Sequence, residues 1–308
     1  MSSEPLTPAV ERPGCTPSDS LRGRVAAVCE VLLAFVLVHL AYRSFKHFTE
    51  LGRLEVGAGL NFSPGAMMTL FTVAVLLLCR RDFARYGLTL ENWRYNLNVG
   101  LLWAVIVVAA AASVVALTPV RLDPLRPPDL PRAVVFSLGQ LALTLLLALF
   151  LRRQRGLLRR VPLTASLLVL ALLLSSPLVL AVAFHRPVLG VLLTTLWLFF
   201  GAGFGEEVFF RGYIHSRINA TFGRSFSLLG IGFGPGLIVS ALLFGLIHGL
   251  NTFDYFGGRY DFRWLALLAG FCSGLFFGVL REGTGSVLAG CVVHGLEDVL
   301  GSVPALLP

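Results

Sequence analysis

Residues 188–211 read VLGVLLTTLWLFFGAGFGEEVFFR, and this stretch decides the fold. Its apolar run, 188–204, is close to the length of about 20 residues with which a helix spans a bilayer. The run leads into Glu206, Glu207 and Arg211. An ionisable side chain near the bilayer centre costs roughly 2.5 to 3.5 kcal/mol, so three of them in so short a segment indicate a use. We therefore expect a transmembrane helix whose polar end carries chemistry.

The composition extends this reading to the whole chain. Hydrophobic residues make up 56% of the 308 residues and charged residues only 14%, a balance that a soluble domain does not need. Apolar runs recur between short polar breaks. We expect an all-α fold, a polytopic transmembrane helix bundle of about eight or nine spans. The expected spans are 24–42, 65–79, 99–117, 133–151, 161–184, 188–204, 226–248, 264–280 and 284–300.

The sequence before residue 188 predicts how the chain is organised in the membrane but contains no motif of a catalytic site. Residues 1–22 are polar and rich in Pro and Ser, without the basic segment and short apolar core of a signal peptide. They are expected to be a disordered cytoplasmic tail. Residues 23–187 are expected to be amino-terminal transmembrane helices.

Basic residues predict the orientation. With nine spans, 16 of the 25 Lys and Arg residues fall on the amino-terminal side and 9 on the other. Basic loops face the cytoplasm, so we expect a multi-pass protein of the plasma or inner membrane with a cytoplasmic amino terminus. Nucleic acid is not expected as a partner, because no basic face alternates with aromatic residues on a soluble domain.

The five cysteines indicate neither a disulfide framework nor a CxxC metal site, because they are scattered and lie mostly in apolar runs. They are Cys15, Cys29, Cys79, Cys272 and Cys291.

The spacing of the charged residues in 206–211 suggests a division of roles. Residues four apart share a helix face, so Glu207 and Arg211 are expected to pair. Glu206 is rotated by about 100° and is left free to face a cavity. The alternative is that both acids neutralise Arg211 and a lysine elsewhere, but the chain has a single lysine, Lys46.

Two later apolar runs also carry ionisable residues. One contains His248, and the other contains His294 with Glu297 and Asp298. Asp298 lies four residues after His294 and shares its helix face, while Glu297 remains an alternative partner. Acids and histidines from separate helices that meet in one bundle can activate water, either through a metal ion or by direct general-base action.

The chain contains EEVFFR at 206–211, FGLIH at 244–248 and HGLED at 294–298, in this order. These segments resemble the EExxxR, FxxxH and Hxxx(N/D) motifs of the CPBP family of intramembrane proteases, which includes the CAAX prenyl endopeptidases and is also called the Abi family. The resemblance covers residues 188–300 or so. It implies a protease core at 188–302.

The resemblance implies a role for each motif residue. Glu206 and His248 look like the pair that activates the attacking water, and His294 and Asp298 like the groups that hold the scissile carbonyl oxygen. We favour catalysis without a cofactor, because no HExxH-type segment is present. The alternative is a zinc protease in which the same four residues bind the metal, since they form an acceptable ligand set.

The same resemblance makes Glu207, Arg211 and Phe244 structural supports. Asp298 departs from the Asn of many relatives, because an ionised carboxylate cannot donate a hydrogen bond to an oxyanion. Asp298 must then be protonated, or it orients His294 as the main donor.

The resemblance implies a membrane-associated peptide or protein substrate. Family members act on prenylated carboxyl termini, on peptide bacteriocins and on carboxyl-terminal anchors. Prenyl processing is the least favoured of these, because the chain is short, Arg-rich and bacterial in character. A non-catalytic immunity or binding protein is the alternative class, and nothing in the sequence indicates the oligomeric state.

Two ionisable residues of the first apolar run have no place in this scheme. Glu30 and His39 are nine positions apart and therefore on opposite helix faces. We expect them to make packing or water contacts.

Overall fold

The computed structural model describes residues 20–117, 130–153 and 158–307. Within these residues, six helices are long and apolar enough to cross a membrane. Two shorter apolar helices, Phe62–Leu78 and Pro235–Gly249, accompany them. The expected all-α transmembrane bundle is thus confirmed, although its span count remains approximate. Most of the expected tail, residues 1–19, lies outside the described residues.

The helices follow one another with short connections. They are α1 (Leu21–Phe48), α2 (Glu50–Gly57), α3 (Phe62–Leu78), α4 (Trp93–Leu117), α5 (Leu130–Arg153), α6 (Leu163–Ala183), α7 (Val188–Leu196), α8 (Ser216–Phe222), α9 (Pro235–Gly249), α10 (Trp264–Thr284) and α11 (Leu288–Gly301). Short 3₁₀ turns cover Phe83–Tyr86, Leu158–Arg160 and Val303–Leu306. The strands are β1 (Phe226–Leu228) and β2 (Ile231–Phe233).

Local signals explain several of these boundaries. The Ser20 hydroxyl accepts a hydrogen bond from the Gly23 N–H and caps the start of α1. Pro235 opens α9, where its missing N–H costs nothing. Gly285 ends α10 in the left-handed conformation that glycine adopts without strain.

The stretch 188–211 lies inside one long helical run and not at the end of a span. Val188–Phe222 forms a continuous helix of 35 residues, and its middle, Trp197–Glu206 and Val208–His215, is π-helical. The expected end at residue 204 was therefore wrong. The buried pairing of Arg211, described below, keeps the charged turn inside the bundle. The wide π-helical turns are uncommon and are frequent at functional sites.

A second expected boundary also needs correction. The span expected over 226–248 begins with a β-hairpin, in which β1 and β2 pair antiparallel, and only α9 is helical. Leu229 and Gly230 connect the strands, both with positive φ. Two consecutive left-handed residues are typical of a type I′ hairpin turn, and a hydrophobicity pattern does not reveal such a turn.

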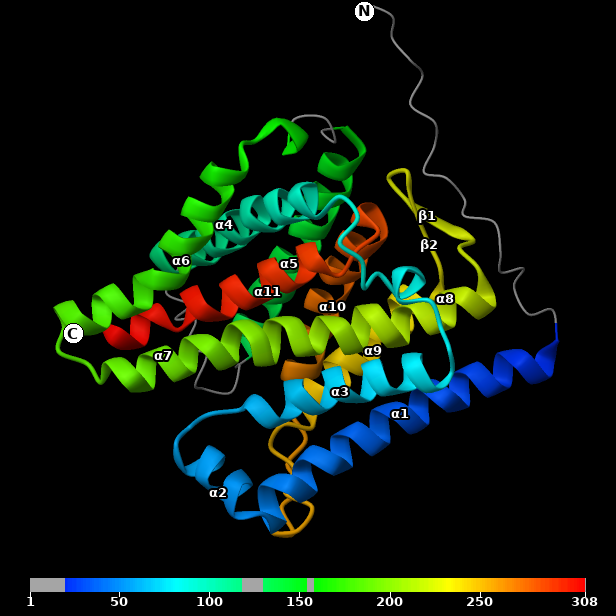
Figure 1. The fold of residues 1–308 in the computed structure, drawn as a ribbon, viewed down its shortest axis with the longest axis horizontal. Coiled ribbons are helices and arrows are strands. Elements are labelled where there is room, and N and C mark those ends of the chain that lie inside the picture. Colours follow the sequence, from blue (N-terminus) through cyan, green and yellow to red (C-terminus); the bar gives the residue numbers. More distant parts are fainter. Residues whose placement is uncertain (1–19, 118–129, 154–157, 308) are drawn as a thin grey trace, which may run out of the picture.

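The long helical run lies through the middle of the molecule, with α11 and α4 on one side and α3 and α1 on the other (Figure 1). Glycines permit the close approach. A Cβ on Gly203 would lie 2.5 Å from the backbone of Gly295 in α11, and one on Gly205 would lie 2.4 Å from Gly65 in α3. Small residues at helix contacts let backbones meet in this way. Two neighbouring helices, α11 and α3, therefore approach the motif-bearing helix closely.

Hydrogen bonds join segments that lie far apart in the chain. The Val287 N–H donates to the Gly87 carbonyl at 3.1 Å, which joins the segment after α10 to the segment after α3. Arg43 donates to the Leu250 carbonyl at 2.9 Å, which joins α1 to the segment after α9.

Arg211 changes the tally of basic residues. Because its side chain is fully buried, it belongs to the bundle interior and not to a loop. Without it the bias is 15 to 9, which still favours a cytoplasmic amino terminus. The orientation remains a prediction.

Cysteine labelling tests this orientation. Arg53 and Arg160 are exposed, and the predicted topology places them on opposite sides of the membrane. In a chain whose five native cysteines are replaced by serine, we expect a membrane-impermeant maleimide to label Arg53→Cys in intact cells. Arg160→Cys should be labelled only after the membrane is permeabilised. The reverse pattern would invert the proposed topology.

Candidate active site

A buried ion pair forms the base of the candidate site. Glu207 Oε1 lies 3.0 Å from the Arg211 guanidinium, and the two side chains are 1% and 0% exposed. The pairing expected from their spacing is therefore present. The Arg211 guanidinium also lies over the rings of Phe244 and Phe277, at 4.2 and 5.0 Å from their centroids. Aromatic faces attract a desolvated cation, so the rings help to stabilise the buried charge.

Glu207 also contacts His294 on α11. Its Oε1 lies 3.2 Å from His294 Nδ1, and a carboxylate only accepts, so Nδ1–H donates. The imidazole stacks on Phe277 at 4.9 Å between ring centroids. Gly290 leaves room for this arrangement, because a Cβ there would lie 2.7 Å from Glu207 Oε2. Glu207 thus joins Arg211 to His294 and fixes the direction of the imidazole.

The other imidazole nitrogen of His294 faces two more carboxylates. Its Nε2 lies 3.9 Å from Glu206 Oε2 and 3.7 Å from Asp298 Oδ2. Both separations exceed hydrogen-bond length. Glu206 Oε2 is buried and has no hydrogen-bond partner among the described residues, whereas the Asp298 side chain is 33% exposed. The three groups together can bind a water molecule or a polar oxygen.

His248 lies at the end of α9, and its tautomer follows from one contact. Nδ1 is 2.8 Å from the Phe244 carbonyl oxygen, which only accepts, so Nδ1 carries a proton. With its proton on Nδ1, a neutral imidazole has Nε2 as its acceptor, the form in which histidine acts as a base. Phe244 packs against both histidine rings, with centroids 4.6 Å from His248 and 5.8 Å from His294. Phe244 is the common neighbour of the two histidines and of Arg211.

The structure brings together part of the predicted set. Glu206, His294 and Asp298 converge, while no hydrogen bond or ion pair within the described ranges joins His248 to them. In the described part of the chain, no group of three or more His, Cys, Asp or Glu residues is arranged to hold a metal ion. The two candidate partners of His294 also differ, since an ion-pair contact joins it to Asp298 and none joins it to Glu297 in the residues described.

Sequence reasoning did not find two features of the site. The contact between Glu207 and His294 joins residues far apart in the chain, and no spacing rule predicts it. Phe277 stacks on His294 and Arg211 but belongs to none of the three motifs. Its only signal is its place beside Gly274 and Gly278, glycines at which α10 packs closely on α9.

The candidate site lies wholly within a segment that comparison with protein families identifies. Residues 187–300 match the family model described as type II CAAX prenyl endopeptidase Rce1-like. Comparisons with curated proteins and with solved structures gave no match. The matched segment runs from the start of α7 almost to the end of α11 and contains the three motifs, so it confirms the resemblance inferred from them. Residues 187–300 of this integral membrane protein are thus similar to the Rce1-like type II CAAX prenyl endopeptidases, a family of intramembrane peptidases.

Proposed function

We propose that the protein is an intramembrane endopeptidase in which Glu206 and His248 activate a water molecule for attack on a peptide carbonyl. The observation that carries this proposal is the buried Oε2 of Glu206, which has no hydrogen-bond partner among the described residues and lies 3.9 Å from His294 Nε2. A general base needs such an unoccupied oxygen within hydrogen-bond reach of its water. His248 Nε2, the acceptor nitrogen of its ring, is the second group that can take a proton from that water.

His294 and Asp298 are proposed to hold the carbonyl oxygen as it becomes an oxyanion. His294 donates its Nδ1 proton to Glu207, so it must carry a second proton on Nε2 to donate to the substrate as well. Preorganised donors aimed at a developing oxyanion are among the largest contributions to catalysis. Glu207 and Arg211 take the structural role, because Glu207 pairs with the Arg211 guanidinium and accepts from His294 Nδ1.

The proposed substrate is a membrane-associated peptide or protein. The family name indicates prenylated carboxyl termini, while unprenylated peptides and carboxyl-terminal anchors remain the preferred classes for this chain. A binding or immunity protein is the second candidate. A binding protein does not need an acid without a hydrogen-bond partner beside a histidine inside the bilayer, because each buried charge there is costly.

Direct digestion tests the proposal. Purified protein in proteoliposomes would be given two internally quenched peptides, one with a farnesylated carboxyl-terminal motif and one with an unprenylated apolar carboxyl-terminal helix. We expect cleavage of the second peptide into two fragments whose masses sum to that of the peptide plus water. Cleavage of the farnesylated peptide alone would correct the substrate class. Binding of both peptides without cleavage would favour the non-catalytic alternative.

Metal removal tests the choice between direct catalysis and zinc. We expect dialysis against a strong chelator to leave turnover unchanged, and elemental analysis of the purified protein to find far less than one zinc per chain. Zinc at one equivalent that disappears in both His248→Ala and His294→Ala would establish the zinc alternative.

Replacing the Asp298 carboxylate with an amide tests the role of this residue. We expect Asp298→Asn to preserve turnover and to extend it to higher pH, because an amide donates a hydrogen bond without needing a proton from solvent. The measurement is the pH profile of kcat for the wild type and the variant. A loss of roughly 10- to 100-fold at every pH would instead show that the carboxylate orients His294, since such supporting contacts have effects of that size.

A further inference from the structure

We infer that α1, which lies outside the family-matched segment, is a positioning element of the peptidase. It fastens to the end of the His248 helix through Arg43 and to the Glu206 helix through Glu30. The inference rests on the proposed function, because it assigns α1 a part in setting the geometry of those two groups.

Arg43 clamps the end of α9. Its Nη2 donates to the carbonyl oxygens of Leu250 and Asn251 at 2.9 and 3.0 Å. These carbonyls follow directly on α9, where backbone acceptors lack helical donors and the helix dipole favours a cation. His248 lies only two residues before Leu250, so this clamp acts on the turn that presents the His248 imidazole.

A second contact reinforces this end. His39 Nε2 lies 3.0 Å from the Tyr255 hydroxyl, and His39 Nδ1 lies 2.8 Å from the Tyr42 hydroxyl. His39 and Tyr42 belong to α1 and are buried, whereas Tyr255 belongs to the connection between α9 and α10. The segment that follows His248 is therefore attached to α1 at two places. His39 makes these polar contacts where the sequence predicts packing or water.

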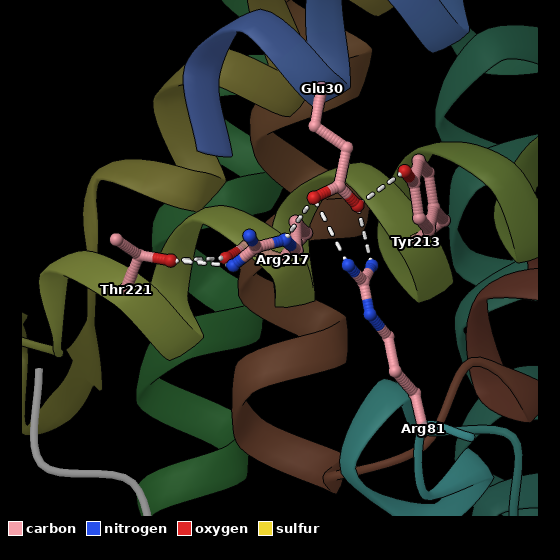
Figure 2. Close-up of polar contacts among 5 residues, drawn as sticks. All are labelled: Glu30, Arg81, Tyr213, Arg217 and Thr221. Atoms are coloured by element: carbon pink, nitrogen blue, oxygen red, sulfur yellow. Dashed lines mark hydrogen bonds and ion pairs between the residues drawn. The ribbon is translucent and has the colours of Figure 1, made fainter. Parts of the chain in front are cut away.

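Glu30 fastens the other half of α1 to the motif-bearing helix (Figure 2). It accepts from Arg217 at 2.8 Å and from the Tyr213 hydroxyl at 2.8 Å, and both residues lie in the run Val188–Phe222. Arg81 adds two contacts, at 2.5 and 3.0 Å. These hydrogen bonds raise the pKa of Arg81 above its ordinary value. Glu30 was expected to make packing or water contacts, and it is instead the centre of a charge network.

Packing connects the two attachment points. Val31, Phe35 and Val38 of α1 share one hydrophobic core with Phe210 of the motif and Phe244 of α9. The Phe35 and Phe210 rings lie 6.4 Å apart and nearly edge to face. One helix thus contacts both elements that carry the proposed base residues. Displacements of about 1 Å at reacting groups can cost about 100-fold in rate, so such a contact is able to control turnover.

Substitutions in the full-length protein test the inference. We expect Arg43→Ala to lower kcat by about tenfold or more with KM within about twofold of the wild type. Arg43→Lys keeps the cation near the carbonyls and should restore part of kcat. The matched control is Arg53→Ala, an exposed arginine of α2 at the same end of the bundle, which should leave kcat unchanged. Glu30→Gln should lower kcat through the other attachment point.

Two further measurements distinguish the outcomes. The melting temperature is taken for every variant, and the kcat of Glu206→Gln is measured with the unprenylated quenched peptide. A kcat that falls in Arg43→Ala and partly recovers in Arg43→Lys, at similar melting temperatures, supports the inference. Wild-type kcat in Arg43→Ala beside an inactive Glu206→Gln would overturn it and leave the proposed function intact. A kcat loss that follows the melting temperature through all variants would also overturn it, because α1 would then only stabilise the fold. An active Glu206→Gln would overturn the proposed function itself.

Discussion

Glu206→Gln is expected to abolish peptide cleavage while leaving the folded protein nearly as stable as the wild type. The substitution preserves shape and removes the proton acceptor. General-base catalysis contributes roughly 100- to 10,000-fold, so turnover should fall by at least that factor. Stability should change little, because Glu206 Oε2 makes no hydrogen bond with the described residues and its nearest ionic neighbour, His294 Nε2, is 3.9 Å away. The measurement is kcat and melting temperature of purified protein.

Glu297→Gln provides the matched control for this prediction. Glu297 lies on α11 near the same site, but it has no ion pair or hydrogen bond to His294 in the described ranges, and the proposal gives it no role. We expect it to retain turnover. Substantial turnover in Glu206→Gln would overturn the assignment of the base. Loss of turnover in Glu297→Gln alone would move the base to α11.

Glu207→Gln is expected to lower both stability and turnover. Removing one charge of a buried ion pair leaves the other uncompensated, which typically costs about 3 to 5 kcal/mol. Arg211 would be that uncompensated charge, with its side chain 0% exposed. The substitution also weakens the acceptor for His294 Nδ1, so the imidazole loses its fixed direction. The measurement is the melting temperature in detergent together with kcat.

A double substitution separates the two effects of Glu207. In Glu207→Leu with Arg211→Met, neither member of the Glu207–Arg211 pair is left as a lone buried charge, so much of the lost stability should return. Turnover should not return, because His294 still lacks its acceptor. An unchanged melting temperature in Glu207→Gln would contradict the role of the ion pair, and full turnover in the double variant would contradict the support of His294.

The membrane fold could be predicted from the sequence because apolar length is a strong signal, but its local geometry could not. The expected helix end at residue 204 was wrong, since charges usually mark the end of a span and Arg211 is instead paired within it. The hairpin that replaces the first turns of the expected 226–248 span depends on positive φ at Leu229 and Gly230. An apolar stretch with glycines is compatible with either structure.

In the candidate site, too, some contacts could be predicted from the sequence and others could not. Spacing within one helix predicted the Glu207–Arg211 pair, because four residues return the chain to the same face. The contact between Glu207 and His294 depends on how closely α11 approaches the motif-bearing helix, which Gly203 and Gly290 permit. The attachments of Arg43 and Glu30 to the family-matched segment likewise depend on the packing of α1. Contacts between distant helices follow from three-dimensional packing, which a single sequence does not contain.

Single turnover in water enriched in ¹⁸O is the most direct test of the claim that Glu206 acts as a base on water. We predict one ¹⁸O atom in the new carboxyl terminus of the cleaved peptide and none in the Glu206 side chain, as read by mass spectrometry. Glu206→Gln should give no labelled product. Label in the Glu206 carboxylate after one turnover would show that this residue attacks the substrate itself, and labelled peptide from Glu206→Gln at the wild-type rate would show that another group activates the water.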